Sequence, residues 1–496
     1  MKKQSFKVQC LNTVLFLLLL STGFVSCKKD TEAVTPTISS SSDTVDVRDS
    51  AYYYSLVYYL WNEKLPDYAK WSVTNGDLIK SSETTFKPHS FENVDSIMSG
   101  SDGIRSYSDI GASGKHLDRY SFAYTQTDWE NTSSGSNAGF GFRRGYLSST
   151  DQRVVYVYKN SPIGLAGVQR GWQILSVNGV EATAANEEAF YNSLNSNSTS
   201  TFVFKTNEGT QKTLTLTKAS YKANFVQKDT VISVGGLKIG YIALSSFLGD
   251  NNGADTEAEL DAAITDLKAA GITDLVIDLR YNGGGYTSVS EYFANLVAPA
   301  SAKGKAMYSY KYNALLTSEF KKAGYTTDIN FDTKSANFNL TRIVFITSEE
   351  TASASELLIN NLKPYVNVTL VGSTTYGKPV GFPGILIEMS KTDVTQNYYV
   401  FPIAFKTVNA NNESDYFDGM TANISSADDY SKDWGNPNEA CFNAAISYLT
   451  GGSTTRQSAR ISSEKLKQLN LNTKNEKLGG INEMITTNKI PMLPFK

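Results

Sequence analysis

Histidine is the most telling scarcity in this sequence, because only His89 and His116 occur among 496 residues. Both lie early, so the later two-thirds of the chain contains no imidazole. A Ser-His-Asp triad needs an imidazole beside its serine, and a His-Glu-x-x-His zinc site needs two histidines on one helix. A nucleophilic serine in the later part of the chain therefore requires another base, for which a lysine is the best-attested substitute.

Cysteine is nearly as rare, and the three cysteines are Cys10, Cys27 and Cys441. The first two lie in an N-terminal segment, so its removal leaves Cys441 alone and excludes an intramolecular disulfide. No Cys-x-x-Cys pair is present, which removes the usual zinc patterns. We expect Cys441 to be a buried small apolar residue, and we expect no metal or cofactor. A net charge of −3 provides no basic face for nucleic acid.

An export signal is indicated over residues 1–27. Lys2, Lys3 and Lys7 give a positive start, residues 14–20 form a short apolar core, and small residues lead to Cys27. The apolar run is too short for a comfortable membrane span. A cysteine at this place resembles the lipobox of bacterial lipoproteins, although Phe24 stands where leucine is usual. The resemblance implies acylation of Cys27; the alternative is an ordinary secretory signal with an incidental cysteine.

The chain that follows the signal changes character twice. Residues 28–48, rich in Ser, Thr and Asp, predict a flexible tether. Residues 49–135 predict a small helical domain, because apolar side chains recur at helical spacing in two places. An aromatic content of 12% also suggests a carbohydrate-binding surface, but a packed core explains it more simply.

Residues 136–220 carry an ordered series of turn motifs. Gly139, Phe140, Gly141 and Phe142 precede a strand-like run, and Ser-Pro, Ala-Gly and Asn-Gly steps follow. This order resembles a PDZ domain, in which backbone N–H groups of a glycine-rich turn bind the terminal carboxylate of a peptide. The resemblance implies that residues 139–142 bind peptides; the alternative is a generic small β domain.

A serine-rich turn and a later lysine organise the rest of the chain. Ser353 lies between an apolar run, residues 343–346, and a predicted helix, residues 354–362. A strand, a tight turn and a helix would place its hydroxyl at a helix N-terminus, where N–H groups and the helix dipole favour an oxyanion. Lys378 follows a second apolar run, and neighbouring parallel strands end at one sheet edge, so the two residues could meet. The alternative is a helix N-cap cluster with an unrelated surface lysine.

Three glycines follow a strand predicted at residues 275–279. In the run Asn282-Gly283-Gly284-Gly285, glycine lets the backbone approach a ligand closely. A phosphate loop would end in Gly-Lys-Ser/Thr, which is absent here. Strands and helices alternate over residues 221–450, which predicts right-handed βαβ units with ligand-binding loops at the strand C-termini. The fold class is therefore α/β within a multidomain α+β chain.

These motifs together resemble the tail-specific, or C-terminal processing, serine peptidases, and specifically lipoprotein members of the Bacteroidetes type. The resemblance rests on Asp278-Leu279-Arg280-x-Asn282-x-Gly284-Gly285, on the turn around Ser353 and on Gly377-Lys378, and it covers roughly residues 139–449. It implies an open α/β core of the crotonase-like kind with Ser353 as nucleophile and Lys378 as general base. It also implies an oxyanion hole formed by the N–H groups of Ala354 and Gly284.

One residue departs from the family pattern near the lysine. Many members have a glutamine that orients the lysine four residues later, whereas this chain has Phe382. Lys378 acts as a base only when its amine is uncharged, which an apolar pocket favours. Either another polar group orients Lys378 or packing alone holds it.

The expected protein is a lipid-anchored serine endopeptidase of the bacterial cell envelope. It would cut polypeptides with exposed, unstructured C-termini through an acyl-enzyme and contact the membrane through its lipid anchor. A non-catalytic peptide-binding lipoprotein on the same fold is the alternative. The predicted parts are a signal (1–27), a tether (28–48), a helical domain (49–135), a PDZ-like domain (136–220), a catalytic domain (221–450) and a weakly packed polar tail (451–496).

Overall fold

The computed structural model describes residues 46–66, 72–74, 77–79, 88, 91–333, 338, 340–452 and 484–486. The predictions for the signal, for Cys27 and for residues 28–45 lie outside the described residues, as does most of the predicted tail.

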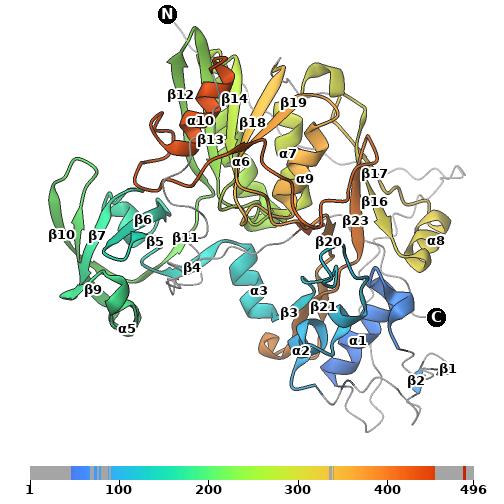
Figure 1. The fold of residues 1–496 in the computed structure, drawn as a ribbon. Coiled ribbons are helices and arrows are strands. Elements are labelled where there is room, and N and C mark those ends of the chain that lie inside the picture. The colour runs from blue at the N-terminus through green and yellow to red at the C-terminus, as the bar shows by residue number, and fades with distance from the viewer. Residues whose placement is uncertain are drawn as a thin grey trace, which may run out of the picture.

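A six-stranded sheet lies at the centre of the larger part of the molecule (Figure 1), in the order β12-β13-β14-β18-β19-β24. The edge strand β12 (Val226–Val234) is antiparallel to β13 (Leu237–Leu244). All later strands run parallel to β13: β14 (Asp274–Asp278), β18 (Arg342–Thr347), β19 (Asn367–Gly372) and β24 (Ile424–Ser425). Strands β14 and β18 are apolar on both faces because both faces are covered. The α/β prediction is confirmed.

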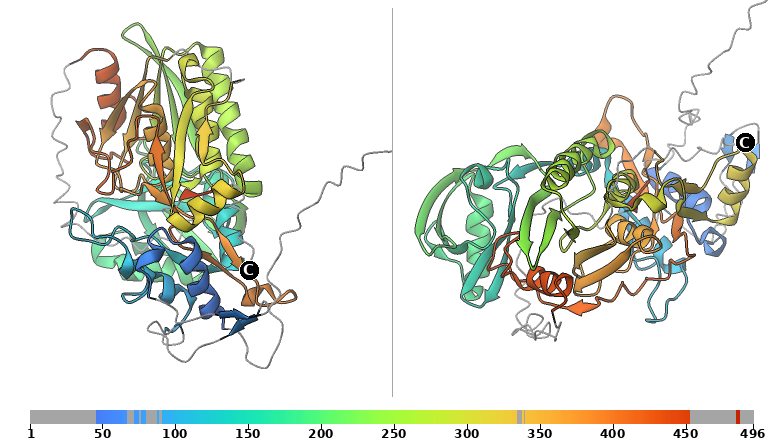
Figure 2. Two further views of the ribbon diagram at one scale, coloured as in Figure 1. Left: turned by 90° about the vertical axis from the view of Figure 1, so that its right-hand side faces the viewer. Right: turned by 90° about the horizontal axis from the view of Figure 1, so that it is seen from above.

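Helices cover both faces of this sheet (Figure 2). On one face α6 (Asp250–Ala270), α7 (Thr287–Val297) and α9 (Ala354–Leu362) share a core with Ile242, Ile277 and Phe345. On the other face α10 (Ala440–Leu449) packs on Tyr241, Val276 and Val344. Cys441 of α10 is buried, as expected.

The carboxyl ends of three adjacent strands carry the predicted site residues. Strand β14 leads into the glycine-rich loop, β18 into the turn before α9, and β19 into the loop that contains Lys378. Because β14, β18 and β19 are parallel neighbours, all three loops leave the sheet at one edge. The predicted βαβ arrangement therefore places the candidate groups together.

The region predicted to be PDZ-like forms a second six-stranded sheet, ordered β10-β9-β7-β6-β5 with β8 paired to β7. A two-stranded ribbon of β4 (Ser136–Gly139) and β11 (Ala219–Lys222) leads into and out of it. Its core is separate from that of the central sheet and is rich in phenylalanine. The elements are β5 (Phe142–Ser148), β6 (Asp151–Val157), α4 (Pro162–Leu165), β7 (Gln173–Val177), β8 (Val180–Glu181), α5 (Glu187–Ser196), β9 (Thr199–Lys205) and β10 (Gln211–Thr217).

The N-terminal region is partly helical but does not stand alone. Helix α1 (Val47–Tyr58) begins two residues before the predicted boundary because the Asp46 side chain accepts a hydrogen bond from the Arg48 N–H. Helices α2 (Val94–Ser99) and α3 (Gln126–Ser133) follow. Strand β3 (Phe122–Thr125) pairs with β22 (Tyr398–Phe401), which also pairs with β21 (Ile385–Ile387). This sheet joins the region to the part of the chain that carries Lys378.

A four-stranded sheet and one short strand pair complete the site region. The sheet has the order β17 (Asp328–Asn330), β16 (Ala306–Tyr312), β23 (Phe405–Asn409), β20 (Val380–Gly381), with α8 (Ala314–Lys322) beside it. Strand β15 (Gly285–Tyr286) pairs in parallel with β25 (Met484–Ile485). Ile485 and Thr486 are buried, so the expectation of a weakly packed tail is wrong for these residues: the isoleucine has an apolar site to enter. Among the helices of the described residues, none combines the length and apolarity of a membrane span.

Candidate active site

Ser353 occupies the turn between β18 and α9 in an unusual backbone conformation. Its φ of 64° and ψ of −115° lie outside the regions that L-residues normally adopt, at a cost of about 1–3 kcal/mol. The side chain is fully buried, and among the described residues its Oγ has no hydrogen-bond partner. A strained residue with an unsatisfied hydroxyl at a strand-to-helix turn is the arrangement that presents a serine nucleophile.

Ala354 is the first residue of α9, directly after Ser353. Backbone N–H groups in the first turn of a helix have no intrahelical acceptor, and the helix dipole is positive there. The predicted helix over residues 354–362 is confirmed at both ends. Its N–H groups therefore lie next to the Ser353 hydroxyl, where an oxyanion would form.

Glu356 joins the serine turn to the lysine loop through one buried carboxylate. Its Oε2 accepts hydrogen bonds from the N–H of Ser353 (2.9 Å) and from the N–H of Lys378 (2.8 Å). Its Oε1 accepts from the N–H of Gly377 (2.8 Å) and from Thr375 Oγ1 (2.5 Å). Burial raises the pKa of Glu356, whereas the four donated hydrogen bonds favour the ionised form. The backbones of Ser353 and Lys378 thus meet at one oxygen atom.

Lys378 lies in an aromatic enclosure. The lysine is 1% exposed, and its Nζ lies 4.3 Å from the ring centre of Phe382 and 4.9 Å from that of Tyr120. The Tyr120 hydroxyl donates to the carbonyl of Gly377 at 2.7 Å, which holds the ring against the lysine loop. Phe382 was expected from its place in the sequence. Tyr120 was not, because no local pattern links residues so far apart in the chain.

The glycine-rich loop is tied to the serine turn by hydroxyl groups. Ser355 Oγ donates to the carbonyl of Asn282 at 2.9 Å, and Thr351 Oγ1 donates to the carbonyl of Leu279 at 2.8 Å. The N–H of Ala352 also donates to Asn282, at 3.1 Å. These bonds explain the cluster of hydroxyl residues around Ser353, since each satisfies a buried carbonyl of the neighbouring loop.

Gly284, the predicted second oxyanion donor, adopts a φ of 117° that favours glycine. In this structure its N–H donates to Asn282 Oδ1 at 2.9 Å. Gly285 has a φ of 137°, and a Cβ there would lie 2.5 Å from the backbone of Phe247. The glycine run therefore permits the backbones of Gly285 and Phe247 to pack closely. The Gly284 N–H is bonded to the Asn282 side chain, which could release it to a substrate oxygen.

The four residues of the predicted peptide-binding turn lie at the junction of β4 and β5. Phe140 and Phe142 point into the core of their own domain, and Gly139 lines a cavity of about 520 Å³ with Tyr191, Asn195 and Lys218. The Lys218 ammonium donates to the carbonyl of Asn195 at 2.8 Å. The turn thus contributes backbone to a polar cavity beside α5, while its aromatic side chains hold the turn in place.

A buried charge cluster connects this domain to the start of the glycine-rich loop. Arg170 of the predicted PDZ-like region and Arg280 of the loop both contact Asp428 at 2.7 Å. Arg280 also pairs with Glu439 and Asp278. Although burial opposes its ionisation, the two guanidinium groups lower the pKa of Asp428 to about 2. The sequence offered no signal for this cluster, because its members come from distant segments.

Within the described ranges, no group of three or more His, Cys, Asp and Glu side chains is placed to hold a metal ion.

Comparison with known proteins finds peptidases among the proteins similar to this chain. Residues 238–403 match peptidase family S41. The chain is 28% identical over 263 residues to a carboxyl-terminal-processing protease of Synechocystis, covering 52% of this chain and 56% of that one. It is 28% identical over 260 residues to the carboxy-terminal processing protease CtpA of Bacillus subtilis, covering 50% and 49%. The chain thus spans about half the length of these relatives.

A solved structure resembles nearly the whole described fold. The putative S41 protease from Bacteroides fragilis superposes with a TM-score of 0.61 at 22% identity, covering 83% of this chain and 99% of that one.

Proposed function

We propose that this chain, whose residues 238–403 match peptidase family S41, is a serine endopeptidase that cleaves unstructured C-terminal segments of proteins. Ser353 is the proposed nucleophile and Lys378 the proposed general base. One observation carries the proposal: a single oxygen of Glu356 accepts hydrogen bonds from the N–H groups of both residues. A shared buried acceptor fixes the distance between the two backbones, as paired catalytic groups require.

The proposed reaction begins with proton transfer from Ser353 Oγ to the neutral amine of Lys378. Oγ attacks the carbonyl carbon of the substrate, and the negative charge on the tetrahedral intermediate is held by the N–H groups of Ala354 and Gly284. The Gly284 N–H exchanges Asn282 Oδ1 for the substrate oxygen in this step. The ammonium of Lys378 then protonates the leaving amine, which leaves an ester on Ser353.

Water completes the proposed cycle. Lys378 removes a proton from a water molecule as its oxygen attacks the ester carbonyl. The bond to Ser353 Oγ then breaks, the Lys378 ammonium returns the proton to Oγ, and the product leaves with a new carboxyl group. Phe382 stands where the family pattern would supply a glutamine, and burial of Lys378 removes water from its amine, which favours the uncharged form.

Peptide capture and membrane anchoring are further parts of the proposal. We assign capture of the substrate C-terminus to the backbone of residues 139–142, with the cavity beside α5 as the place where the chain end is held. A peptide with a free C-terminus should bind more tightly than the same peptide amidated. We also propose that Cys27 carries a lipid that holds the protein in the cell envelope. The division of the chain into signal, tether, helical domain, PDZ-like domain, catalytic domain and tail is likewise a proposal. Labelling with a clickable fatty acid should depend on Cys27.

A fluorophosphonate probe tests the catalytic assignment. We expect labelling of the parent protein, and loss of labelling in Ser353→Ala and in Lys378→Ala. Lys391→Ala is the matched control for Lys378→Ala, because Lys391 is exposed. Labelling that persists in Lys378→Ala would identify another base. A folded parent protein that neither labels nor cleaves peptides would support the peptide-binding alternative.

A further inference from the structure

A short segment of the chain lies as a strand inside the candidate active site. Met484 and Ile485 pair in parallel with Gly285 and Tyr286. On the other side Ile485 forms a parallel bridge with Phe382, and the N–H of Thr486 donates to the carbonyl of Phe382 at 3.2 Å. The segment is therefore held on both edges by backbone that comes from the glycine-rich loop and from the lysine loop.

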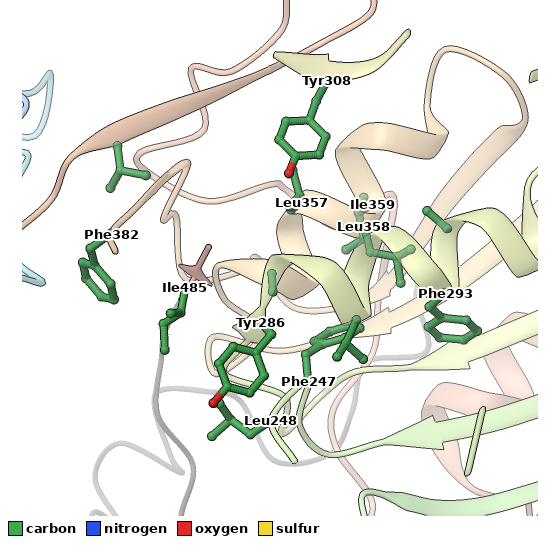
Figure 3. Packing of buried hydrophobic residues seen from close by; sticks show 14 of the residues in the cluster. Phe247, Leu248, Tyr286, Phe293, Tyr308, Leu357, Leu358, Ile359, Phe382 and Ile485 are labelled. Atoms are coloured by element: carbon green, nitrogen blue, oxygen red, sulfur yellow. The ribbon is translucent and has the colours of Figure 1, made fainter. Parts of the chain in front are cut away.

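The side chains of Ile485 and Thr486 are buried as well. Ile485 is 4% exposed and lies between Phe382 and Tyr286 (Figure 3). Thr486 Oγ1 lies 3.2 Å from the hydroxyl of Tyr310, which is itself bonded to Tyr308. Successive side chains of a strand point to opposite sides. Ile485 therefore meets the apolar site formed by Phe382 and Tyr286, and Thr486 meets the polar site at the Tyr310 hydroxyl.

The strand runs beside both halves of the proposed machinery. Gly285 is adjacent to Gly284, the proposed oxyanion donor, and the Phe382 ring lies 4.3 Å from Lys378 Nζ. A polypeptide substrate must present an extended backbone at this place, and adding a strand to existing strand edges is a recurrent way to hold one. The position that a substrate would take is thus filled by the chain itself.

We propose that Met484–Thr486 is a resident peptide that competes with other polypeptides for this strand position. The proposal rests on the assignment of Ser353 and Lys378 as the proposed active site. It specifies the ligand class as an extended peptide with a branched aliphatic side chain at the position of Ile485. Other substrates must displace the segment before they reach Ser353, which is fully buried in this structure.

The first test compares full-length variants by their rate of fluorophosphonate labelling and by KM for an unstructured peptide. Ile485→Asp and the milder Ile485→Ala should raise the labelling rate and lower KM about tenfold, with kcat nearly unchanged, because loss of the buried side chain weakens only the competing segment. Ile110→Ala is the matched control, since the same atoms are removed from a side chain that is 58% exposed. Equal rates and KM values in all four proteins would overturn the proposal.

A second test does not depend on proteolysis. A fluorescent peptide with the sequence of residues 481–487 should bind the Ser353→Ala Ile485→Asp double variant, and at least tenfold more weakly the Ser353→Ala protein that retains its own segment. A peptide with aspartate at the isoleucine position should not bind. Absence of peptide binding to the folded double variant would refute the docking, whereas binding without any cleavage by the parent would refute only the proposed peptidase activity.

Discussion

Glu356→Gln is the substitution that most directly examines how this site is held together. Each oxygen of the Glu356 carboxylate accepts two hydrogen bonds. Oε2 accepts from the N–H groups of Ser353 and Lys378, and Oε1 accepts from the Gly377 N–H and the Thr375 hydroxyl. Glutamine has the same shape, but one oxygen becomes an NH₂ group that would face two donors. Whichever way the amide is turned, two hydrogen bonds are lost and donors oppose each other.

The magnitude follows from those bonds. Each hydrogen bond to a charged group contributes about 1.5–3 kcal/mol, so loss of two costs about 3–6 kcal/mol. Removal of a buried charge offsets part of this cost, because the neutral amide is easier to desolvate. We therefore expect the free energy of unfolding to fall by about 3 kcal/mol. Displacement of Ser353 from Lys378 by about 1 Å should lower the labelling rate about 100-fold or more.

Urea unfolding and fluorophosphonate labelling measure the two effects on the same samples. Glu349→Gln is the matched control, because Glu349 lies before the same turn with an exposed side chain and should change neither value. A Glu356→Gln protein that is as stable and as readily labelled as the parent would refute the view that this carboxylate positions the two residues.

Three further predictions concern the surroundings of the site. Phe382→Leu should lower the labelling rate about tenfold and the free energy of unfolding by about 1 kcal/mol, since the ring beside Lys378 is lost but apolar volume is largely kept; an unchanged labelling rate would show that the ring does not hold the amine. Burial raises the pKa of Glu291 to about 7, although the Tyr308 hydroxyl donates to it. Its pKa in the folded protein is above the unfolded value of 4.5, so the free energy of unfolding should decline by about 2 kcal/mol as the pH rises from about 4.5 through about 7. Urea unfolding measured across this pH range should show the decline in the parent protein and not in Glu291→Gln. The pKa of Asp428 is lowered from 3.8 to about 2, so its contribution of about 2 kcal/mol is present above about pH 4 and is lost as the pH falls toward 2; a parent-like acid-unfolding curve for Asp428→Asn would contradict this.

The aromatic enclosure of Lys378 is only partly predictable from the sequence. The departure at Phe382 is evident from the sequence, which leaves either packing or another polar group to hold Lys378. Tyr120 supplies the second ring, from a strand-forming region that was expected to be helical and separate. Aromatic residues are common in this chain, so nothing local distinguished Tyr120 from the many that only fill a core.

The sequence by itself determined those features that depend on local pattern. Helix α9, the buried strands β14, β18 and β19 and their common edge follow from apolar periodicity and from the rule that parallel strands present their loops together. The helix start at Ala354 and the serine before it follow for the same reason.

Tertiary structure alone decided the contacts that join distant segments. The Glu356 carboxylate between two loops, the Arg170–Asp428–Arg280 cluster and the docking of Ile485 beside Phe382 each bring together residues that no short-range pattern relates. These contacts are strong because they lie in a water-excluded interior where their hydrogen bonds are satisfied, and that interior exists only once the chain has folded around them.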